Sequence, residues 1–556
     1  MEAKQNKQAS TLEKAHQDQA TNNDHPGNFL QDGEIQYPSG WKLALIFVAL
    51  CLTNFLVALD QTIIATAIPT ITSQFHSIQD IGWYGSAYLL TTCSFQLFFG
   101  KLYTLLSIKW TFVAAVLIFE VGSTICGASP NSVALIVGRA IAGIGGSGIF
   151  SGALIIIAKS VPLANRPAFT GVIGAVWGVA SVAGPLLGGA FTSWSYLSYP
   201  ESIVVVNLPI GAVAIPFIVL FLSTPRQHNP KRSSWMGMAQ QFDPIGTVLF
   251  IAAIVCLLIA LQWGGSKYEF RSGREIALLT VFGVLMVAWG FTQWKMGENA
   301  TVPLRIARQP TVAFATFYIL LGSAAFVLPI YYLPIWFQGI KGDTASESGI
   351  HNLPLVLSVV GFAIGGGLGV TLVGYYTPFM IAGALIMSVG AGLLLLFRVD
   401  IPVSMWLGFQ IIFGAGAGLG LELPNIAVQT VLSEKDVSIG TSLIVLARSL
   451  GGAIFVSAGQ NVFNDHIISG MTNKVPEIDY PIVLQSGATE LQGTIRQIAS
   501  GHADVVSRVL EVYNDAVVQT FVVALVLACM SIIGAIGVEW RSIKNKPKNQ
   551  KSNEVA

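Results

Sequence analysis

Long apolar runs separated by short polar connections dominate this sequence from Trp41 onward. Fourteen of these runs are long enough to cross a ~30 Å hydrocarbon layer as helices. The first eight lie near residues 42–65, 82–101, 110–129, 132–158, 168–191, 203–223, 244–263 and 275–294. The last six lie near residues 311–337, 349–373, 375–397, 402–431, 438–461 and 516–537. The pattern predicts an all-α integral membrane protein with 14 transmembrane helices.

Polar segments flank and interrupt these runs. Residues 1–40 have no periodicity and predict a disordered tail, whereas residues 538–556 form a basic tail. An even number of spans puts both tails on one side, and most of the 30 Lys and Arg residues then share that side. The positive-inside rule makes it the cytosol, although loop 264–274 carries three basic residues on the outer side. Residues 462–515 read as a long extracellular loop, in which the helical period of 491–512 suits a surface helix.

A weak internal repeat divides the runs into two sets. Arg139 in the fourth run is followed by glycines four and six positions later, and so is Gln410 in the twelfth. This spacing favours two six-helix halves, residues 41–223 and 311–537, with residues 243–294 as a linker helix pair. Parallel repeats of this kind are typical of secondary transporters.

Composition excludes several classes of protein. Hydrophobic residues make up 53% and charged residues 11% of the chain, against roughly 25% charged in soluble domains. The net charge of +1 gives no sign of a nucleic-acid partner. The five cysteines lie in apolar runs without a CxxC spacing, so neither a disulfide framework nor a metal site is expected. The seven histidines fall in predicted tails and loops, which leaves proton transfer within the membrane to carboxyl groups.

No sequence motif points to an enzyme, a bound cofactor or ATP. Gly143, Gly145 and Gly148 match the dinucleotide pattern GxGxxG, but no strand precedes them, so close helix packing is the better interpretation. P-loop, HExxH and GxSxG motifs are absent from the sequence. We therefore expect a protein that is not an enzyme, binds no cofactor and is not driven by ATP.

Charged residues inside the apolar runs are the candidate functional residues, since each costs about 2.5–3.5 kcal/mol or more at the bilayer centre. Asp60 lies roughly 27 Å along the first run, and Arg139 lies at a similar depth in the fourth. The two can therefore pair, either as a proton-coupling site or as a static ion pair. Glu120, near mid-membrane in the third run, is either a proton carrier or a silent hydrogen-bonding group.

A second group of candidates suits a substrate cavity. Glu422 lies beside Pro424 in the twelfth run, where Arg448 of the thirteenth is a candidate partner; the two are coupling residues or only cavity-lining charges. Aromatic and amide residues add apolar walls with a few polar groups, which suit apolar or weakly cationic amphipathic ligands. The cavity candidates are Gln61, Trp177, Tyr332, Trp336, Gln429 and Arg448.

Several stretches resemble motifs of the fourteen-span drug:proton antiporters of the major facilitator superfamily. Residues 59–69 (LDQTIIATAIP) resemble the first-span motif of that family, and Arg139 with its glycines resembles the fourth-span motif, whose arginine is implicated in proton transfer. Residues 180–189 (ASVAGPLLGG) resemble the antiporter motif, whose distorted helix is associated with export. The antiporter-motif helix would contain Gly171, Gly184, Pro185, Gly188 and Gly189.

The resemblance covers residues 40–540 and is most specific to fungal efflux pumps for toxins and drugs; residues 207–211 (NLPIG) and 332–338 (YLPIWFQ) also fit. Some positions depart from the pattern. Thr104 stands where the superfamily has an aspartate, and Ser107 replaces a glycine, which puts a charge-relay gate at that loop in doubt.

The resemblance implies a secondary transporter that exports amphipathic small molecules in exchange for protons. It implies a monomer in the plasma membrane, with lipid, substrate and protons as its partners. A vacuolar or plasma-membrane transporter of basic amino acids or siderophores is the alternative on the same fold. A channel or a membrane enzyme is the alternative from another class, but the sequence has no clustered nucleophile or metal ligands.

Overall fold

Helices account for almost all of the described chain. The computed structural model describes residues 37–38, 40–75, 80–193, 199–222, 241–265, 268–498 and 503–544. The predicted disordered tail 1–40 therefore lies almost wholly outside the described residues, as does the second part of the predicted basic tail. From Pro38 onward the chain forms one compact unit, and the description below is confined to it.

The N-terminal helices are α2 (Trp41–Phe75), α3 (Ile81–Leu105), α4 (Ile108–Gly127), α5 (Ser132–Ser160), the 3-10 turn η2 (Leu163–Asn165), α6 (Arg166–Ser193) and α7 (Tyr199–Phe221). The linker pair is α9 (Pro244–Trp263) and α10 (Gly273–Met296), followed by η3 (Gly297–Asn299) and α11 (Leu304–Ala307). The C-terminal helices are α12 (Pro310–Trp336) with the π-helical turn η4 (Phe337–Lys341), α13 (Ala345–His351), α14 (Leu353–Val373), α15 (Thr377–Leu394), α16 (Val403–Gly420), α17 (Leu423–Val431), α18 (Val437–Lys474), α19 (Tyr480–Ile498) and α20 (Ala503–Gly537).

Each of the fourteen predicted runs coincides with helical structure, but the predicted number of spans is not confirmed. Among the described residues, twelve helices are long and apolar enough to cross a membrane. The remaining two runs correspond to α3, which is not among the twelve, and to α7, of which Asn207–Phe221 counts as a shorter apolar helix. Polar side chains such as Ser94 and Gln96 lower the hydropathy of α3 and are buried against its neighbours.

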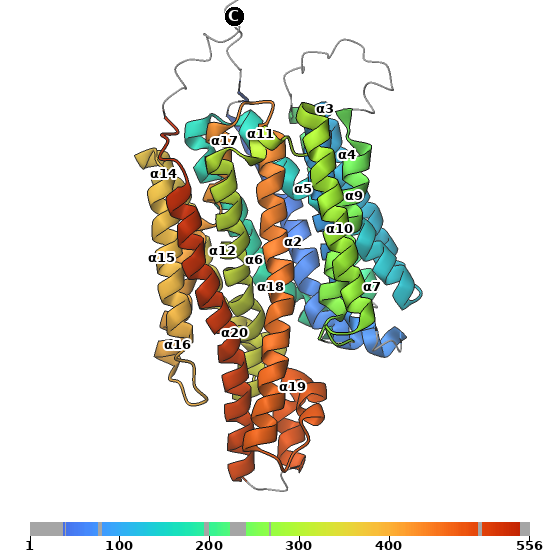
Figure 1. Ribbon diagram of the computed structural model, residues 1–556, viewed down its shortest axis with the longest axis vertical. Helices are drawn as coiled ribbons and strands as arrows, with labels where there is room; N and C mark the ends of the chain where they lie inside the picture. Colours follow the sequence, from blue (N-terminus) through green and yellow to red (C-terminus); the bar gives the residue numbers. More distant parts are fainter. Residues whose placement is uncertain are drawn as a thin grey trace, which may run out of the picture. The chain divides into compact units, whose positions relative to one another are not determined.

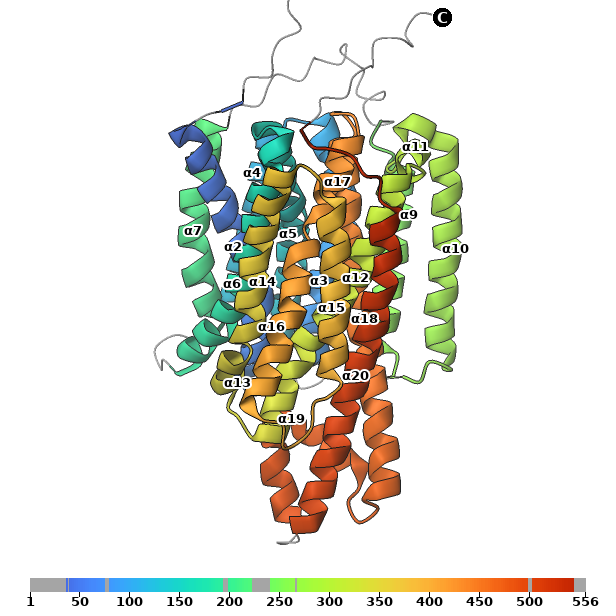
Figure 2. The ribbon, with the colours of Figure 1, turned by 90° about the vertical axis from the view of Figure 1, so that its left-hand side faces the viewer.

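The packing of the N-terminal helices recurs among the C-terminal helices. α4 packs on α5 and α7 as α15 packs on α16 and α20, and α2 packs on α6 as α12 packs on α18. α3 packs on α5 as α14 packs on α16. The blue-to-green and yellow-to-red helices accordingly form two neighbouring groups (Figures 1 and 2), each around its own hydrophobic core.

Glycines at equivalent positions of the two repeats allow these helices to pack with their backbones in contact. A Cβ on Gly143 would meet the Tyr88 carbonyl of α3 at 2.4 Å, and one on Gly414 would meet the Leu355 carbonyl of α14 at 2.5 Å. Two residues further on, Gly145 abuts α4 and Gly416 abuts α15 in the same way. The GxGxxG pattern therefore serves helix packing, and the repeat predicted from Arg139 and Gln410 has a direct structural counterpart.

The two groups of helices meet along two seams, α3 with α18 and α6 with α14. A Cβ on Gly100 of α3 would lie 2.6 Å from the Ser442 Cβ of α18. On the other seam, a Cβ on Gly367 of α14 would lie 2.3 Å from the Pro167 carbonyl of α6. We name the end of the bundle where α2 begins the inner end, following the predicted topology, and both contacts lie towards it.

The linker helix α9 packs against both sides of the α3–α18 seam. Leu97 of α3, Ile254 of α9 and Leu446 of α18 belong to one hydrophobic cluster. Towards the outer end, the hydroxyl of Ser457 in α18 donates to the carbonyl of Leu261 at 2.5 Å. The linker pair is therefore part of the bundle rather than a loose connection between its two groups.

A buried carboxylate holds the inner end of the linker pair. Asp243 caps α9 in a left-handed conformation (φ 46°) and accepts hydrogen bonds from the Gly246 amide, the Gln293 side chain and both the amide and the hydroxyl of Thr301, at 2.8–3.0 Å. Burial raises the pKa of Asp243, but these hydrogen bonds outweigh it and hold the pKa below its usual value. The loop fixed in this way offers the carbonyls of Asn299 and Ala300 to Lys101 of α3, at 3.0 and 2.7 Å.

The segment 462–515, predicted as a long extracellular loop, is helical over most of its described length. α18 continues to Lys474, α19 packs beside it, and α20 begins at Ala503 (Figure 1). The helical period predicted for 491–512 is matched by α19 up to Ile498 and by α20 from Ala503, while residues 499–502 lie outside the described residues. The segment folds back because its apolar residues bury against one another and against η4; these include Ile467, Met471, Leu491, Val512 and Tyr513.

Two histidines lie in helices rather than in the predicted loops. His351 ends α13, with Nδ1 2.5 Å from Asp343 Oδ2, and His466 lies in the extension of α18. Both are near the outer end and are not among the candidate charged residues. The predicted break between the tenth and eleventh runs is confirmed, since α14 ends at Val373 before Gly374 at φ 91°.

Replacing Asp243 by Ala removes the cap and every hydrogen bond to its carboxylate. We expect the free energy of unfolding to fall by about 2–4 kcal/mol at neutral pH. Because the folded pKa is lowered, this stabilisation is present above the ordinary carboxyl pKa of about 4 and disappears as pH falls further. Thermal unfolding of the purified protein at pH 7 and pH 3.5 measures both effects. Ser272→Ala, which removes a single 3.4 Å cap on α10, is the control; an equal loss there would contradict the assignment.

Gly145→Val should leave little folded protein, because any Cβ would lie 2.4 Å from the Phe119 backbone nitrogen. The repeat predicts the same outcome for Gly416→Val, whose Cβ would lie 2.1 Å from the Met387 nitrogen. Gly408→Val is the matched control, since nothing lies within 4 Å of its Cβ position. Size-exclusion profiles in detergent compare the three, and wild-type yield of Gly145→Val would refute the packing role.

Candidate functional site

Asp60 and Arg139 form a buried ion pair among the N-terminal helices. The Arg139 Nη1 contacts the Asp60 carboxylate and also donates to the Asp60 carbonyl at 3.1 Å. The side chains are 1% and 2% exposed, respectively. α2 and α5 run in opposite directions, which brings the two residues to the same depth. A charge this deeply buried is tolerated only when it is paired.

Further contacts hold the Arg139 guanidinium independently of the Asp60 carboxylate. Nε donates to the Tyr84 carbonyl of α3 at 2.9 Å, and the guanidinium carbon lies 4.7 Å from the centre of the Tyr88 ring. Gly146 leaves the space for that ring, because a Cβ there would lie 2.3 Å from the Tyr88 hydroxyl. Arg139 therefore keeps its position through α3 as well as through α2.

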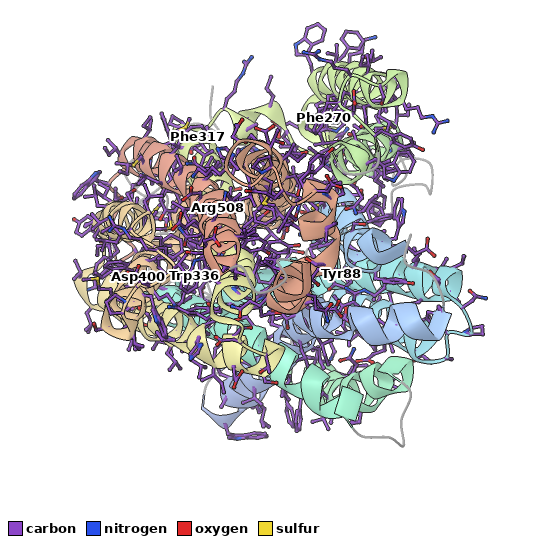
Figure 3. The ribbon with its side chains drawn as sticks, turned by 90° about the horizontal axis from the view of Figure 1, so that it is seen from below. Tyr88, Phe270, Phe317, Trp336, Asp400 and Arg508 are labelled. Carbon is purple, nitrogen blue, oxygen red and sulfur yellow. The ribbon has the colours of Figure 1, made fainter. Side chains whose placement is uncertain are left out.

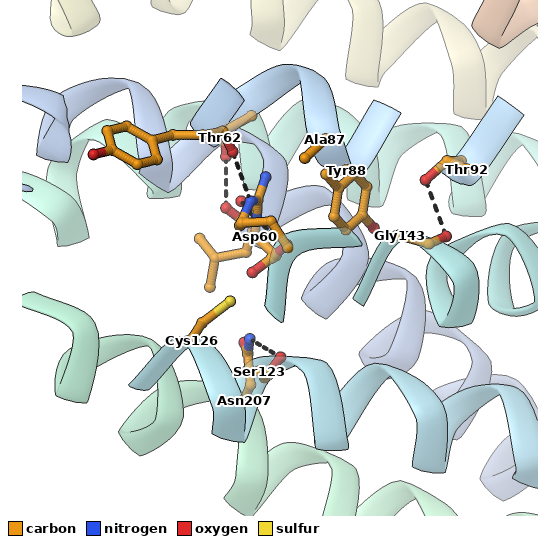
Figure 4. A network of polar contacts seen from close by, with 12 residues as sticks. Asp60, Thr62, Ala87, Tyr88, Thr92, Ser123, Cys126, Gly143 and Asn207 are labelled. Atoms are coloured by element: carbon orange, nitrogen blue, oxygen red, sulfur yellow. Dashed lines mark hydrogen bonds and ion pairs between the residues drawn. The ribbon is translucent and has the colours of Figure 1, made fainter. Parts of the chain in front are cut away.

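A second polar group lies close to Asp60 (Figure 4). Asn207 of α7 donates to the Ser123 hydroxyl of α4 at 3.1 Å, and both residues are buried. Glu120 lies one turn before Ser123, 7% exposed, and neither of its carboxyl oxygens has a hydrogen-bond partner among the described residues. Gly211 of α7 accommodates it, since a Cβ there would lie 2.0 Å from Glu120 Oε1. In this structure Glu120 therefore has no partner for a static hydrogen-bonding role.

Glu422 and Arg448 form a second ion pair, in the C-terminal helices. Arg448 Nη1 donates to Glu422 Oε1 at 2.6 Å. Glu422 occupies the break between α16 and α17, a break that the sequence analysis missed when it treated residues 402–431 as one run. Pro424 at the start of α17 explains the break, because proline lacks the amide that would continue the helix.

This second pair touches the N-terminal helices. A Cβ on Gly174 of α6 would lie 2.7 Å from Glu422 Cγ, so only glycine fits there. The Arg448 guanidinium lies 5.7 Å from the centre of the Phe150 ring of α5, and that ring meets Trp177 edge to face at 5.6 Å. The predicted cavity residues Trp177 and Arg448 are thus brought together across the boundary between the two groups of helices.

The remaining predicted cavity residues are Gln429, Gln61, Tyr332 and Trp336, and they do not all lie at this boundary. Gln429 is buried in α17, seven residues after Glu422, and its Oε1 has no partner among the described residues. Gln61 is partly buried next to Asp60. Tyr332 and Trp336 are fully buried in the core of the C-terminal helices. Trp336, labelled in Figure 3, donates its Nε1–H to Asn514 at 2.8 Å.

The glycines of the antiporter-motif helix face different neighbours. Gly171 lies against the Ala363 carbonyl of α14, where a Cβ would approach to 2.4 Å. Gly184 lies against Thr62 of α2, whose hydroxyl donates to the Ala180 carbonyl at 3.1 Å. α6 therefore contacts α2 next to Asp60 and α17 at Glu422. Pro185, Gly188 and Gly189 belong to α6, but their packing lies outside the described residues.

In the altered loop after α3, the contacts seen among the described residues are not those of a charge relay. The Thr104 hydroxyl donates to the Gly100 carbonyl at 2.9 Å within its own helix. Lys101 instead binds the carbonyls of the loop that follows the linker pair. The charge of Lys101 is therefore used to attach α3 to the linker.

Sequence reasoning missed Tyr88, Ser123 and Phe150. Asn207, which donates to Ser123, was noted in the sequence only as part of the motif at residues 207–211. The others are ordinary residue types in apolar runs, and their roles arise from helix neighbours that the local pattern does not specify.

Helices in two groups of repeated packing, each with an ion pair inside the bundle, define a membrane transporter built from parallel repeats. The sequence matches the Major Facilitator Superfamily over residues 50–456. This chain belongs to that superfamily.

Its relatives include fungal efflux pumps. The MFS-type efflux pump MFS1 of Arthroderma benhamiae is 51% identical over 516 residues, which cover 92% of this chain and 94% of the relative. Efflux pump aflT of Aspergillus parasiticus is 46% identical over 510 residues, covering 91% and 97%. The Aspyridones efflux protein of Neocamarosporium betae is 47% identical over 516 residues, covering 92% and 89%.

Solved structures with a similar fold are transporters of the same superfamily. A bacterial homologue of the human lysosomal transporter Spinster superimposes with a TM-score of 0.55 and 17% identity, covering 90% of this chain and 98% of the homologue. The proton:xylose symporter XylE gives a TM-score of 0.54 and 12% identity, covering 87% and 95%. At these identities the likeness shows the shared fold alone.

Replacing Arg139 by Gln leaves the Asp60 carboxylate buried without its charged partner. We expect the free energy of unfolding to fall by about 3–5 kcal/mol. Asp60→Asn/Arg139→Gln, which removes both charges, should recover most of this loss. Tryptophan fluorescence during thermal unfolding in detergent measures the cycle; a double variant as unstable as the sum of the single variants would refute the pairing.

Proposed function

We propose that this protein exports amphipathic small molecules in exchange for protons, with Asp60 as the group that binds the coupling proton. The observation that carries the proposal is the burial of the Asp60–Arg139 pair, 2% and 1% exposed, in an otherwise apolar bundle. Ionisable residues inside a membrane are costly and usually mark an ion or substrate pathway. The kinship with fungal efflux pumps supports export as the direction of transport.

The contacts of Arg139 allow Asp60 to change its charge without unfolding the site. When Asp60 takes up a proton, the guanidinium keeps the carbonyls of Tyr84 and Asp60 and the ring of Tyr88. The attraction between α2 and α5 then weakens, because one of the two charges has gone. Protonation of Asp60 therefore weakens the attraction between α2 and α5 without unfolding the site.

α6 is the element suited to carry this change to the substrate. It touches α2 at Thr62, two residues from Asp60, and touches Glu422 at Gly174. We propose that the two groups of helices, residues 41–223 and 311–537, rock about the α3–α18 and α6–α14 seams, with residues 243–294 as the linker pair. Substrate binds at the boundary between them, beside Trp177 and Arg448.

The same proposal includes the finer topology. Fourteen spans, with α3 and α7 added to the twelve that meet the length and hydropathy criteria, put both termini on one side. The basic residues favour the cytosol for that side, and the plasma membrane is the location that fits an exporter. We further propose that the protein works as a monomer without a cofactor or ATP.

Asp60→Asn should abolish proton-driven export while leaving the bundle folded. In proteoliposomes that contain the full chain, a pH gradient drives export of a fluorescent amphipathic dye by the parent, and the rate for the variant should fall to that of protein-free liposomes. Asp400→Asn, the same change in an exposed outer loop, is the control and should retain the parent rate. Gradient-driven export by Asp60→Asn at the parent rate would overturn the proposal.

A further inference from the structure

Arg139 and Arg448 differ in how many of their guanidinium N–H donors are free to bind a ligand. Arg139 is 1% exposed and bound on several sides, whereas Arg448 is 21% exposed although it lies about three turns into α18. Among the described residues, the contacts of its guanidinium are one hydrogen bond to Glu422 and the face of the Phe150 ring. A guanidinium has five N–H donors, so most of those on Arg448 remain available to a ligand.

The carboxylate partner is the less accessible half of this pair. Glu422 is 6% exposed, and Gly174 of α6 lies directly against its side chain. An incoming molecule therefore meets the positive group first. A cation would have to reach Glu422 past Arg448, against the repulsion of its charge.

A second donor lies beside the same aromatic ring. Trp177 packs edge to face on Phe150, and its Nε1 has no hydrogen-bond partner among the described residues. Indole N–H groups only donate, so this group also requires an acceptor. Two donors around an aromatic ring suit a molecule with an aromatic or apolar body and an oxygen-rich acidic group.

We propose that Arg448 binds an anionic group of the transported molecule, and that the substrates are amphipathic acids carrying a carboxylate, phenolate or enolate. This deepens the proposed export function and rests on it. It replaces the expectation from the sequence of apolar or weakly cationic compounds. Glu422 holds the guanidinium in place when the site is empty, and the acid takes up the donors that Glu422 leaves unused.

One dye carrying three different charges tests the proposal. Dansylglycine is an acid, dansylglycinamide is its neutral counterpart, and dansylcadaverine is a cation. Titrated against the full-length protein in detergent, the acid should bind about tenfold more tightly than the amide, as one charge-assisted hydrogen bond predicts, and the cation most weakly.

The variants are chosen to keep the fold. Arg448→Gln alone leaves Glu422 buried and unpaired, so the test variant is Arg448→Gln/Glu422→Gln, with thermal unfolding as the check on folding. It should bind the acid no more tightly than the amide. Lys159→Gln/Glu434→Gln removes a more exposed ion pair, 3.4 Å long, and should preserve the preference for the acid.

Equal binding of acid and amide by the parent, tightest binding of the cation, or a preference that survives in the test variant would each overturn the proposal. Export in proteoliposomes separates it from the function on which it rests. Export of the amide or the cation without preference for the acid refutes acid recognition alone. Acid-selective binding without export of any dye refutes the export function and leaves the anion site standing.

Discussion

Lipid supplies no counter-ion, so each arginine inside this bundle must have its charge balanced by the protein itself. Asp60 does this for Arg139 and Glu422 does it for Arg448, and each balance links helices that are distant in the sequence. The glycines around these pairs follow from the same constraint. Close helix contacts at Gly146, Gly174 and Gly211 leave room for Tyr88, Glu422 and Glu120, so the charged and aromatic groups can be buried without opening the bundle.

The two groups of helices share their packing but not their chemistry. Gln410 stands where the repeat places Arg139, and it is fully buried with both side-chain polar atoms unpaired among the described residues. The neutral amide of Gln410 needs no counter-charge. The ion pair of the C-terminal helices, Glu422 with Arg448, lies elsewhere, at the break before α17. In the proposed function one group responds to protons while the other faces the substrate, and α6 touches Glu422 and also lies against Thr62 of α2, two residues from Asp60.

Much of the fold followed from the sequence, because apolar runs and glycine spacing report directly on lipid contact and helix packing. The similar depths of Asp60 and Arg139 also predicted their contact, since helix rise alone sets that depth. Tyr88, Asn207 and Ser123 were harder, because their placement depends on which helices become neighbours. The helical continuation of α18 to Lys474 was missed for a related reason: the apolar residues of that segment are sparse and are buried only once α18, α19 and α20 lie together.

The central claim is that Asp60 exchanges its proton when substrate binds, and the direct measurement is proton release by the purified protein in weakly buffered solution. Saturating substrate should release protons from the parent protein, detected with a pH-indicator dye, and Asp60→Asn should release none. Substrate binding without proton release by the parent, or equal release by the parent and Asp60→Asn, would contradict the account.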